Sequence, residues 1–196
     1  MAGALPQRQI VPLCSMSQLR KHLKFTFLNR WRAWRQSSRL AHIGKGVWID
    51  KRVELLRFPA NISIGDEVVL KEGAKICACN AKAQVKIGSR CTVGYHTFIF
   101  ASAGISIGED CMIAPFVYFV DSDHGTKKGQ VMNQQPNSAE AITVGNDVWI
   151  ASNVTILKGV NIADGAVIAA NSVLNQNVGP NEIWGGTPAK KIGERD

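Results

Sequence analysis

The chain has 196 residues, of which 45% are apolar, and its net charge is +8. This length allows one domain with a continuous core. No apolar run approaches the ~18 residues of a membrane-spanning helix, and the order of regions found in a signal peptide is missing. The five cysteines include no CxxC pair, so the sequence predicts buried free thiols in a reducing compartment and predicts neither a disulfide framework nor a metal site.

The positive charge is concentrated near the N-terminus. Residues 1–49 hold nine Lys or Arg and no acidic residue, whereas the rest of the chain holds 14 basic and 15 acidic residues. The charge is therefore a property of the N-terminal segment, and the remainder is close to neutral. Nucleic-acid binding is not favoured, because no sequence-reading motif accompanies the basic residues.

Residues 1–16 contain two prolines without any period and are predicted to form a mobile arm. From residue 17 to about 38, apolar residues recur every three or four positions, which predicts an amphipathic helix. Two interpretations remain open. The helix could cover the open end of the following core, or it could rest on anionic lipid, with its tryptophans at the interface. The apolar residues of this stripe are Leu19, Leu23, Phe27, Trp31 and Trp34.

From residue 43 the apolar pattern has a period of six. The clearest part, 144–179, reads VGNDVW, IASNVT, ILKGVN, IADGAV, IAANSV and LNQNVG, each block beginning with Val, Ile or Leu. This period fits neither a helix nor a simple alternating strand. If each block is a short strand plus a turn, three blocks form one coil of a triangular prism, and Gly, Asn and Asp suit its corners. The sequence thus predicts an all-β, parallel β-helix of hexapeptide repeats.

The repeat is interrupted once by a long polar segment, 125–143, and His124 stands at its root. A long loop extruded from a regular solenoid usually carries function. We therefore divide the chain into a basic N-terminal arm and helix (1–42), a β-helix catalytic domain (43–180) with the loop 125–143, and a C-terminal tail (181–196).

These features resemble the hexapeptide-repeat acyltransferases. The most similar branch contains galactoside, maltose and serine acetyltransferases and bacterial polysaccharide O-acetyltransferases. The resemblance lies in the hexads, the single loop, the histidine before it, VGNDVWIASNVTILKGV and the closing GGTPAKKI. The resemblance covers about residues 43–192. It implies a left-handed β-helix, acetyl-CoA as co-substrate, and a homotrimer with active sites in the grooves between neighbours.

Transfer of an acetyl group from a thioester to an alcohol requires a base near neutrality and donors for the tetrahedral oxyanion. A histidine suits the first task. Aligned hexad by hexad, IGEDCMIAPFVYFVDSDH places His124 on the catalytic histidine of the family. Asp121 and Asp123 flank it, and we expect one of them to orient or stabilise the imidazole, unless both only solvate the loop root.

Coenzyme A in this family lies along the C-terminal coils, so the resemblance implies small side chains where it passes. A tryptophan would flank the reactive end, and a lysine near the C-terminus would suit the phosphates. The residues expected to bind coenzyme A are Trp149, Ala151, Ser152, Ala169, Ala170, Asn175 and Lys190.

The acceptor pocket departs from the simple sugar acetyltransferases. Their acceptor-binding asparagine and aspartate align with Gly94 and Ser102, so we do not transfer their substrates to this chain. Tyr95 and His96 lie close by in sequence, and we expect a sugar ring to stack there. Aromatic residues on a β-helix could equally pack in a trimer interface.

We predict an acetyl-CoA-dependent O-acetyltransferase acting on a sugar hydroxyl of a cell-surface polysaccharide or its precursor. The alternative is an N-acetyltransferase for a nucleotide-linked amino sugar. A γ-type carbonic anhydrase would need three zinc-binding histidines, but residues 98–196 contain one histidine, so no metal is expected. A non-catalytic scaffold would leave the loop unexplained. We expect a cytoplasmic protein, and lipid binding by residues 17–38 would place it at the inner face of the membrane.

Overall fold

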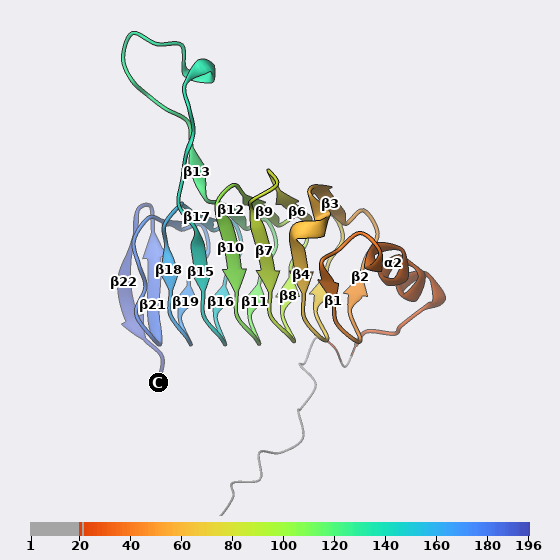
Figure 1. The fold of residues 1–196 in the computed structure, drawn as a ribbon. Helices are drawn as coiled ribbons and strands as arrows, with labels where there is room; N and C mark the ends of the chain where they lie inside the picture. The colour runs from red at the N-terminus through yellow and green to blue at the C-terminus, as the bar shows by residue number, and fades with distance from the viewer. Residues whose placement is uncertain (1–19, 21) are drawn as a thin grey trace, which may run out of the picture.

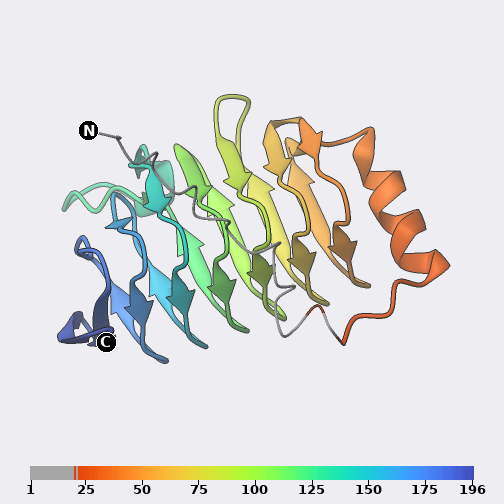
Figure 2. The same cartoon turned by 90° about the horizontal axis from the view of Figure 1, so that it is seen from below.

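The chain forms a parallel β-solenoid with one α-helix at its N-terminal end, and the computed structural model describes residues 20 and 22–196 (Figure 1). The coils stack along one axis, between helix α2 at one end and a hairpin at the other (Figure 2). This arrangement confirms the predicted β-helix of hexapeptide repeats.

Each coil contributes one short strand to each of three faces, here called A, B and C, and equivalent strands of successive coils pair in parallel. Face A contains β1 (His42–Ile43), β4 (Ile62–Ile64), β7 (Gln84–Ile87), β10 (Gly104–Ile107), β15 (Ile142–Val144) and β18 (Asn161–Ile162). Face B contains β2 (Trp48–Ile49), β5 (Val69–Leu70), β8 (Thr92–Val93), β11 (Met112–Ile113), β16 (Trp149–Ile150), β19 (Val167–Ile168), β21 (Glu182–Gly186) and β22 (Ala189–Glu194). Face C contains β3 (Glu54–Arg57), β6 (Lys75–Ala78), β9 (Phe98–Ala101), β12 (Tyr118–Val120), β17 (Thr155–Ile156) and β20 (Val173–Leu174).

The first residue of each hexad points into the prism and stacks on its equivalent one coil away. On face A, Ile87 pairs with Ile107, and Ile107 pairs with Val144. All three side chains are at most 3% exposed. A column of this kind requires a branched aliphatic residue at every sixth position, and this requirement produces the period seen in the sequence.

The cysteines of the coils are free thiols within the described part of the chain, and Cys14 lies outside it. Cys77, Cys91 and Cys111 are buried, as predicted. Burial and the neighbouring Cys77 raise the pKa of the half-buried Cys79 to about 12. This thiol is therefore protonated near neutrality and is a poor nucleophile.

Helix α2 covers Phe27–Ser37, so the prediction of one continuous helix from residue 17 to about 38 was wrong. Residues 23–26 are not helical, and the hydroxyl of Thr26 caps α2 by accepting from the Asn29 amide. Ser17, Leu19 and the predicted arm 1–16 lie outside the described residues. The helix does pack on the first coil, but with the side opposite the predicted stripe, where it buries Asn29 and Gln36 and sets Ala33 against the core.

The interruption after face C forms a stalk and a tip that stand away from the coils (Figure 1). Strands β13 (Ser122–Asp123) and β14 (Ser138–Ala139) pair antiparallel at its root. At the tip, the 3-10 turn η2 (Met132–Gln134) precedes Gln135, whose buried amide bonds to Lys127 and Gln130. A second 3-10 turn, η1 (Pro59–Asn61), lies between β3 of face C and β4 of face A.

Most of the segment predicted as a C-terminal tail forms the hairpin β21–β22, which extends face B. Glu182 lies at its start, where its carboxylate accepts from the Gly179 amide and the Trp184 indole. Within the described range, no helix has the length and apolar character that crossing a bilayer requires.

Candidate active site

His124 is exposed at the edge of the prism where face C turns toward face A, here called edge C–A. It follows β13 directly and therefore sits on the root of the extruded loop. An open cleft of about 780 Å³ adjoins it. The lining residues are Asp123, His124, Gly125, Thr126, Lys127, Ser138 and Lys158.

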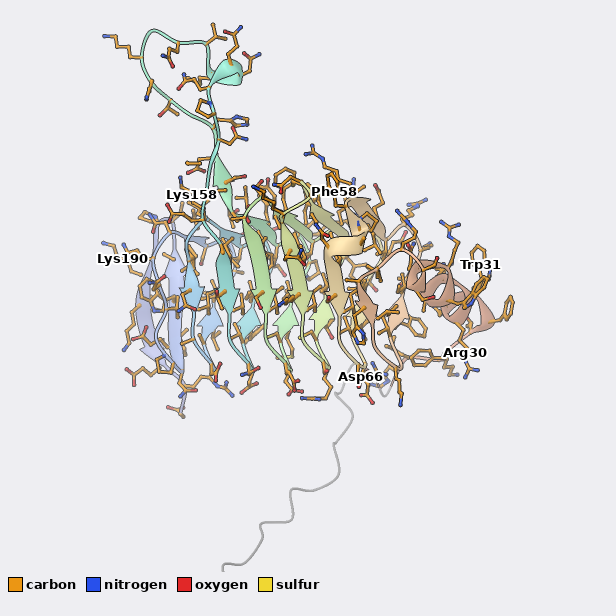
Figure 3. All side chains as sticks on the ribbon, viewed as in Figure 1. Arg30, Trp31, Phe58, Asp66, Lys158 and Lys190 are labelled. Atoms are coloured by element: carbon orange, nitrogen blue, oxygen red, sulfur yellow. The ribbon has the colours of Figure 1, made fainter. Side chains whose placement is uncertain are left out.

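Lys158 joins both arms of the loop root to the next coil. Its ammonium group lies 3.1 Å from Oδ2 of Asp123 and donates to the hydroxyl of Ser138 at 2.6 Å. Asp123 and Ser138 are cross-strand partners in the β13–β14 pair. Figure 3 shows Lys158 at the base of the loop. The side chain therefore fixes the strand that ends at His124.

Asp121 lies inside the prism and has a structural role. Its side chain is fully buried, and its two carboxylate oxygens accept from the backbone amides of Ser102, Ala103 and Gly104 at 2.6–2.8 Å. These bonds hold the turn of the preceding coil. Asp123, in contrast, is exposed and lies in the cleft beside His124. Within residues 22–196, neither carboxylate hydrogen bonds to the imidazole.

Ser102 also lies at edge C–A. Its hydroxyl is 3.1 Å from that of Ser122, which is part of β13. Asn175 follows β20 at the same edge and is exposed. The residues predicted for the site that lie along edge C–A are Ser102, Asp121, Asp123, His124 and Asn175.

The other predicted residues lie along a different edge, where face B turns toward face C, here called edge B–C. His96 and Phe116 occupy corners with φ of 54° and 61°, and their rings stack at 5.5 Å. A Cβ at Gly73, one coil earlier, would lie 2.4 Å from Nδ1 of His96, so glycine is required there for the imidazole to fit. Tyr95 is exposed and lies beneath the ammonium group of Lys71.

Next to edge B–C, face B carries an apolar groove of about 270 Å³ that includes Tyr95, Met112 and Trp149. Trp149 is 47% exposed. Gly94 is also in this groove, but it is buried, and a Cβ there would lie 2.4 Å from the backbone of Ala114. Its function is therefore to let two coils approach, and it offers no side chain to a ligand.

The small residues predicted to bind coenzyme A continue along edge B–C, one coil after another. Ala151 and Ser152 follow β16, and Ala169 and Ala170 follow β19. None of the four is fully buried, so this strip is accessible. Lys190 is exposed on β22, opposite Gly185. One chain therefore places His124 on one edge and the predicted coenzyme A strip on another.

The sequence interpretation missed Lys127, Ser138 and Lys158. A signal for Lys158 was present, because Phe119 pairs with Ile156 and each is followed two residues later by a charged residue, Asp121 or Lys158. Lys158 therefore occupies, one coil later, the position that Asp121 occupies at the loop root. Ser138 could not be found in this way, because its partner is set by the hairpin inside the loop.

The coiled fold, its buried hexad positions and the single extruded loop define a hexapeptide-repeat protein. Two family models match: "Bacterial transferase hexapeptide (six repeats)" over residues 141–176, and "Hexapeptide repeat of succinyl-transferase" over residues 84–114. With the relatives described next, these matches show that the chain is similar to the hexapeptide-repeat acyltransferases.

Three relatives illustrate the sequence similarity. A putative lipopolysaccharide biosynthesis O-acetyl transferase, WbbJ, of Escherichia coli K12 is 28% identical over 72% of this chain and 79% of its own length. Galactoside O-acetyltransferase of the same organism is 32% identical over 57% of this chain, which spans about half (55%) of that protein. Polysialic acid O-acetyltransferase of Neisseria meningitidis is 32% identical over 41% of this chain and 38% of its own length.

Solved structures show the same fold. A hexapeptide-repeat acetyltransferase of Vibrio cholerae, in complex with acetyl coenzyme A, is 26% identical, with a TM-score of 0.63 over 87% of this chain and 80% of that one. The N-acyltransferase AntD of Bacillus cereus, with dTDP and coenzyme A, has a TM-score of 0.75 over 83% of this chain and 88% of its own. At 20% identity, this second likeness concerns the fold alone.

Proposed function

We propose that this protein transfers an acetyl group from acetyl-CoA to a sugar hydroxyl of a cell-surface polysaccharide or its precursor. The observation that carries the proposal is the exposed His124 at the mouth of a cleft, on a loop root fixed by Lys158. The similar sequences from bacteria are O-acetyltransferases for lipopolysaccharide, galactosides and polysialic acid, by their names. Because acetyl-CoA is the donor, we place the reaction in the cytoplasm.

His124 is the general base of the proposed mechanism. A neutral imidazole nitrogen takes the proton from the acceptor hydroxyl while its oxygen attacks the thioester carbonyl carbon. The tetrahedral intermediate then collapses, the carbon–sulfur bond breaks, and the imidazolium returns the proton to the departing sulfur. The protein contributes an exposed histidine, which acceptor and donor can both reach, and a rigid scaffold that holds it.

We further propose that two copies of the chain complete each site. His124 is on edge C–A, whereas the coenzyme A strip and Trp149 are on edge B–C and face B of the same chain. A homotrimer, as in the family that the sequence resembles, would place edge C–A of one copy opposite edge B–C of the next. The extruded loop supports this arrangement, because Val131 and Met132 are 61% and 64% exposed at its tip.

In this arrangement the pantetheine chain follows the accessible small residues from Ser152 to Ala170, and the phosphates reach Lys190 near the C-terminal hairpin. Asn175, one coil beyond Lys158, would line the opposite wall of the same groove. A strip of small side chains suits a long, flexible ligand that bonds to backbone groups. An exposed lysine suits its phosphates.

The aromatic residues of edge B–C are the proposed acceptor platform. Tyr95 lines the same groove as Trp149, while His96 and Phe116 stack on each other at the neighbouring corners of this edge, and aromatic rings of this kind pack against the apolar side of a sugar ring. Ser102 offers a hydroxyl on the His124 side. The second candidate function is N-acetylation of a nucleotide-linked amino sugar, because AntD, an N-acyltransferase seen with dTDP, shares this fold.

The test is to incubate the protein with acetyl-CoA and two acceptor panels, and to follow release of the coenzyme A thiol. One panel contains oligosaccharides of bacterial surface polysaccharides, and the other contains nucleotide-linked amino sugars. We expect thiol release with the first panel and a product whose acetyl group alkaline hydroxylamine removes, since oxygen esters are cleaved under these conditions and amides are not. A hydroxylamine-resistant product formed from an amino sugar would establish the second candidate, and no binding of coenzyme A would reject both.

A further inference from the structure

Helix α2 turns its apolar stripe toward solvent. Phe27 is 79% exposed and Trp34 is 71% exposed, although both lie in a segment that packs on the first coil. Trp31, between them on the stripe, is 41% exposed. These positions are separated by four and three residues, so the three side chains lie on one line along the helix. Figure 3 shows Trp31 on the outer side of α2, pointing away from the coils.

The opposite side of α2 carries Asn29, Ala33 and Gln36. Ala33 packs against the core, and hydrogen bonds attach the two polar residues to the solenoid. The side-chain amide of Asn29 donates to the Ile49 carbonyl at 3.3 Å. Gln36 accepts from Arg39 at 2.9 Å, and Arg39 also donates to the Leu55 carbonyl at 3.2 Å. These contacts hold this side of the helix against the solenoid, so the aromatic stripe on the other side faces solvent. Exposure of the stripe is part of the fold.

Cations flank the stripe on both sides. In a helical projection, Arg30 lies beside it on one side and Arg35 lies beside it on the other. The guanidinium of Arg35 lies 5.4 Å from the ring centroid of Trp31. No acidic residue occurs anywhere in residues 1–49. The outward surface therefore combines large aromatic side chains with positive charge that no neighbouring carboxylate on the helix neutralises.

This combination matches the interface of a membrane that contains anionic lipid. Tryptophan rings partition into the headgroup region, and arginines beside them attract lipid phosphates. A second copy that docked through the same face would set Arg30 and Arg35 against their own equivalents, because residues 1–49 contain no acidic residue. The charge complementarity therefore favours lipid over a second copy of this chain.

We propose that the outward face of α2, formed by Phe27, Leu28, Arg30, Trp31, Trp34 and Arg35, binds the surface of an anionic membrane. The helix lies in the plane of the interface and does not cross the bilayer. Because α2 lies at the N-terminal end of the solenoid and the His124 loop emerges nearer the other end, this contact leaves the proposed active site open to solvent (Figure 1). The inference is independent of which acceptor the enzyme uses.

The test is cosedimentation of the full chain with vesicles of phosphatidylcholine alone and of phosphatidylcholine with phosphatidylglycerol. We expect binding to the anionic vesicles, a blue shift of tryptophan emission on binding, and loss of both in high salt. The double variant Trp31→Gln/Trp34→Gln should lower partitioning by ~10-fold or more, because two apolar groups no longer enter the interface. Arg30→Gln/Arg35→Gln should lower it about fivefold for each charge removed.

Matched controls lie elsewhere on the surface. Phe58→Gln removes an aromatic ring that is 43% exposed on another part of the molecule, and Lys82→Gln removes an exposed charge. Both controls should bind like the wild type, and all variants should keep the wild-type melting temperature. Equal binding to neutral and anionic vesicles, or unchanged binding of the tryptophan variant, would overturn the proposal. A tryptophan variant that changed the oligomeric mass and left lipid binding untouched would show that the face joins copies of this chain.

Discussion

Lys158 and Asp123 form an ion pair across two successive coils, with 3.1 Å between Nζ and Oδ2. The lysine belongs to the coil after the extruded loop, and the aspartate is the residue before His124. The same ammonium group also bonds to Ser138 on the returning arm. The position of the histidine on the solenoid therefore depends on a side chain that the next coil supplies.

We expect Lys158→Met to lower kcat/KM about tenfold, because the loop root loses the group that joins its two arms. The melting temperature should change little, since partly exposed ion pairs contribute only about 0–1 kcal/mol. The matched control is Lys75→Met, which removes an inter-coil ion pair with Glu54 at 3.5 Å, away from the cleft. Steady-state kinetics would contradict this role if both variants lost the same activity or if neither did.

His124→Ala should lower turnover by ~10²- to 10⁴-fold, the usual contribution of a general base. The side chain is exposed and has no hydrogen-bond partner within residues 22–196, so the melting temperature and the affinity for coenzyme A should remain those of the wild type. His42→Ala, an exposed histidine of β1, is the control and should be fully active. Wild-type turnover in His124→Ala would rule out the proposed mechanism.

Asp121→Ala should destabilise the protein. The buried carboxylate satisfies three backbone amides, and its removal leaves buried donors without a partner, so we expect the free energy of unfolding to fall by about 3 kcal/mol. Asp123→Asn, two residues later and exposed, should have a stability close to that of the wild type. Thermal unfolding followed by circular dichroism checks both. If Asp121→Ala melted like the wild type, the structural role of this carboxylate would be wrong.

The fold could be predicted because its rule is local. Each hexad places one branched aliphatic residue inside the prism. Repeating this residue every six positions produces stacked columns such as Ile87, Ile107 and Val144. The difference between Asp121 and Asp123 was also readable in principle. Every second residue of this strand of face C points into the prism. Val117 and Phe119 are buried in this way, and Asp121 is the next residue of the same series.

Other features depend on contacts that a one-dimensional pattern does not contain. The sequence showed the apolar stripe of α2 but not the direction in which the stripe faces. That direction depends on the bond from Asn29 to the first coil and on Arg39, which links Gln36 to the same coil. The two edges of the site were missed for a similar reason. The period of six shows that corners exist, whereas assigning His124 and His96 to different corners requires counting hexads through the longer block IFASAGIS at residues 99–106.

The shared site predicts complementation between variants. His124→Ala lacks the proposed base. Trp149→Ala lacks a residue that, in the proposed trimer, faces the His124 of the neighbouring copy. A homotrimer of either variant should therefore be impaired. Each mixed trimer has one pair of neighbours in which one copy supplies His124 and the next supplies Trp149, so one site of three is intact, which gives about a third of wild-type activity. Coexpression with two different tags, purification of the mixed species and an activity assay provide the test. No recovered activity would place both residues in the site of a single chain.

Glu182 predicts a defined pH dependence for the C-terminal hairpin. Its pKa falls from 4.5 to about 2 because it accepts hydrogen bonds from Lys191 first, and then from the Trp184 indole and the Gly179 amide. A depressed carboxylate pKa stabilises the folded state above the unfolded-state value of about 4.5, and that contribution is lost as pH falls through about 2. Glu182→Gln should therefore melt below the wild type near neutral pH, and the two melting curves should converge between pH 4.5 and pH 2. Glu194→Gln removes the other, more exposed carboxylate partner of Lys191 and should cause a smaller change. A difference between Glu182→Gln and wild type that persisted undiminished below pH 2 would show that the contribution does not arise from the ionised carboxylate.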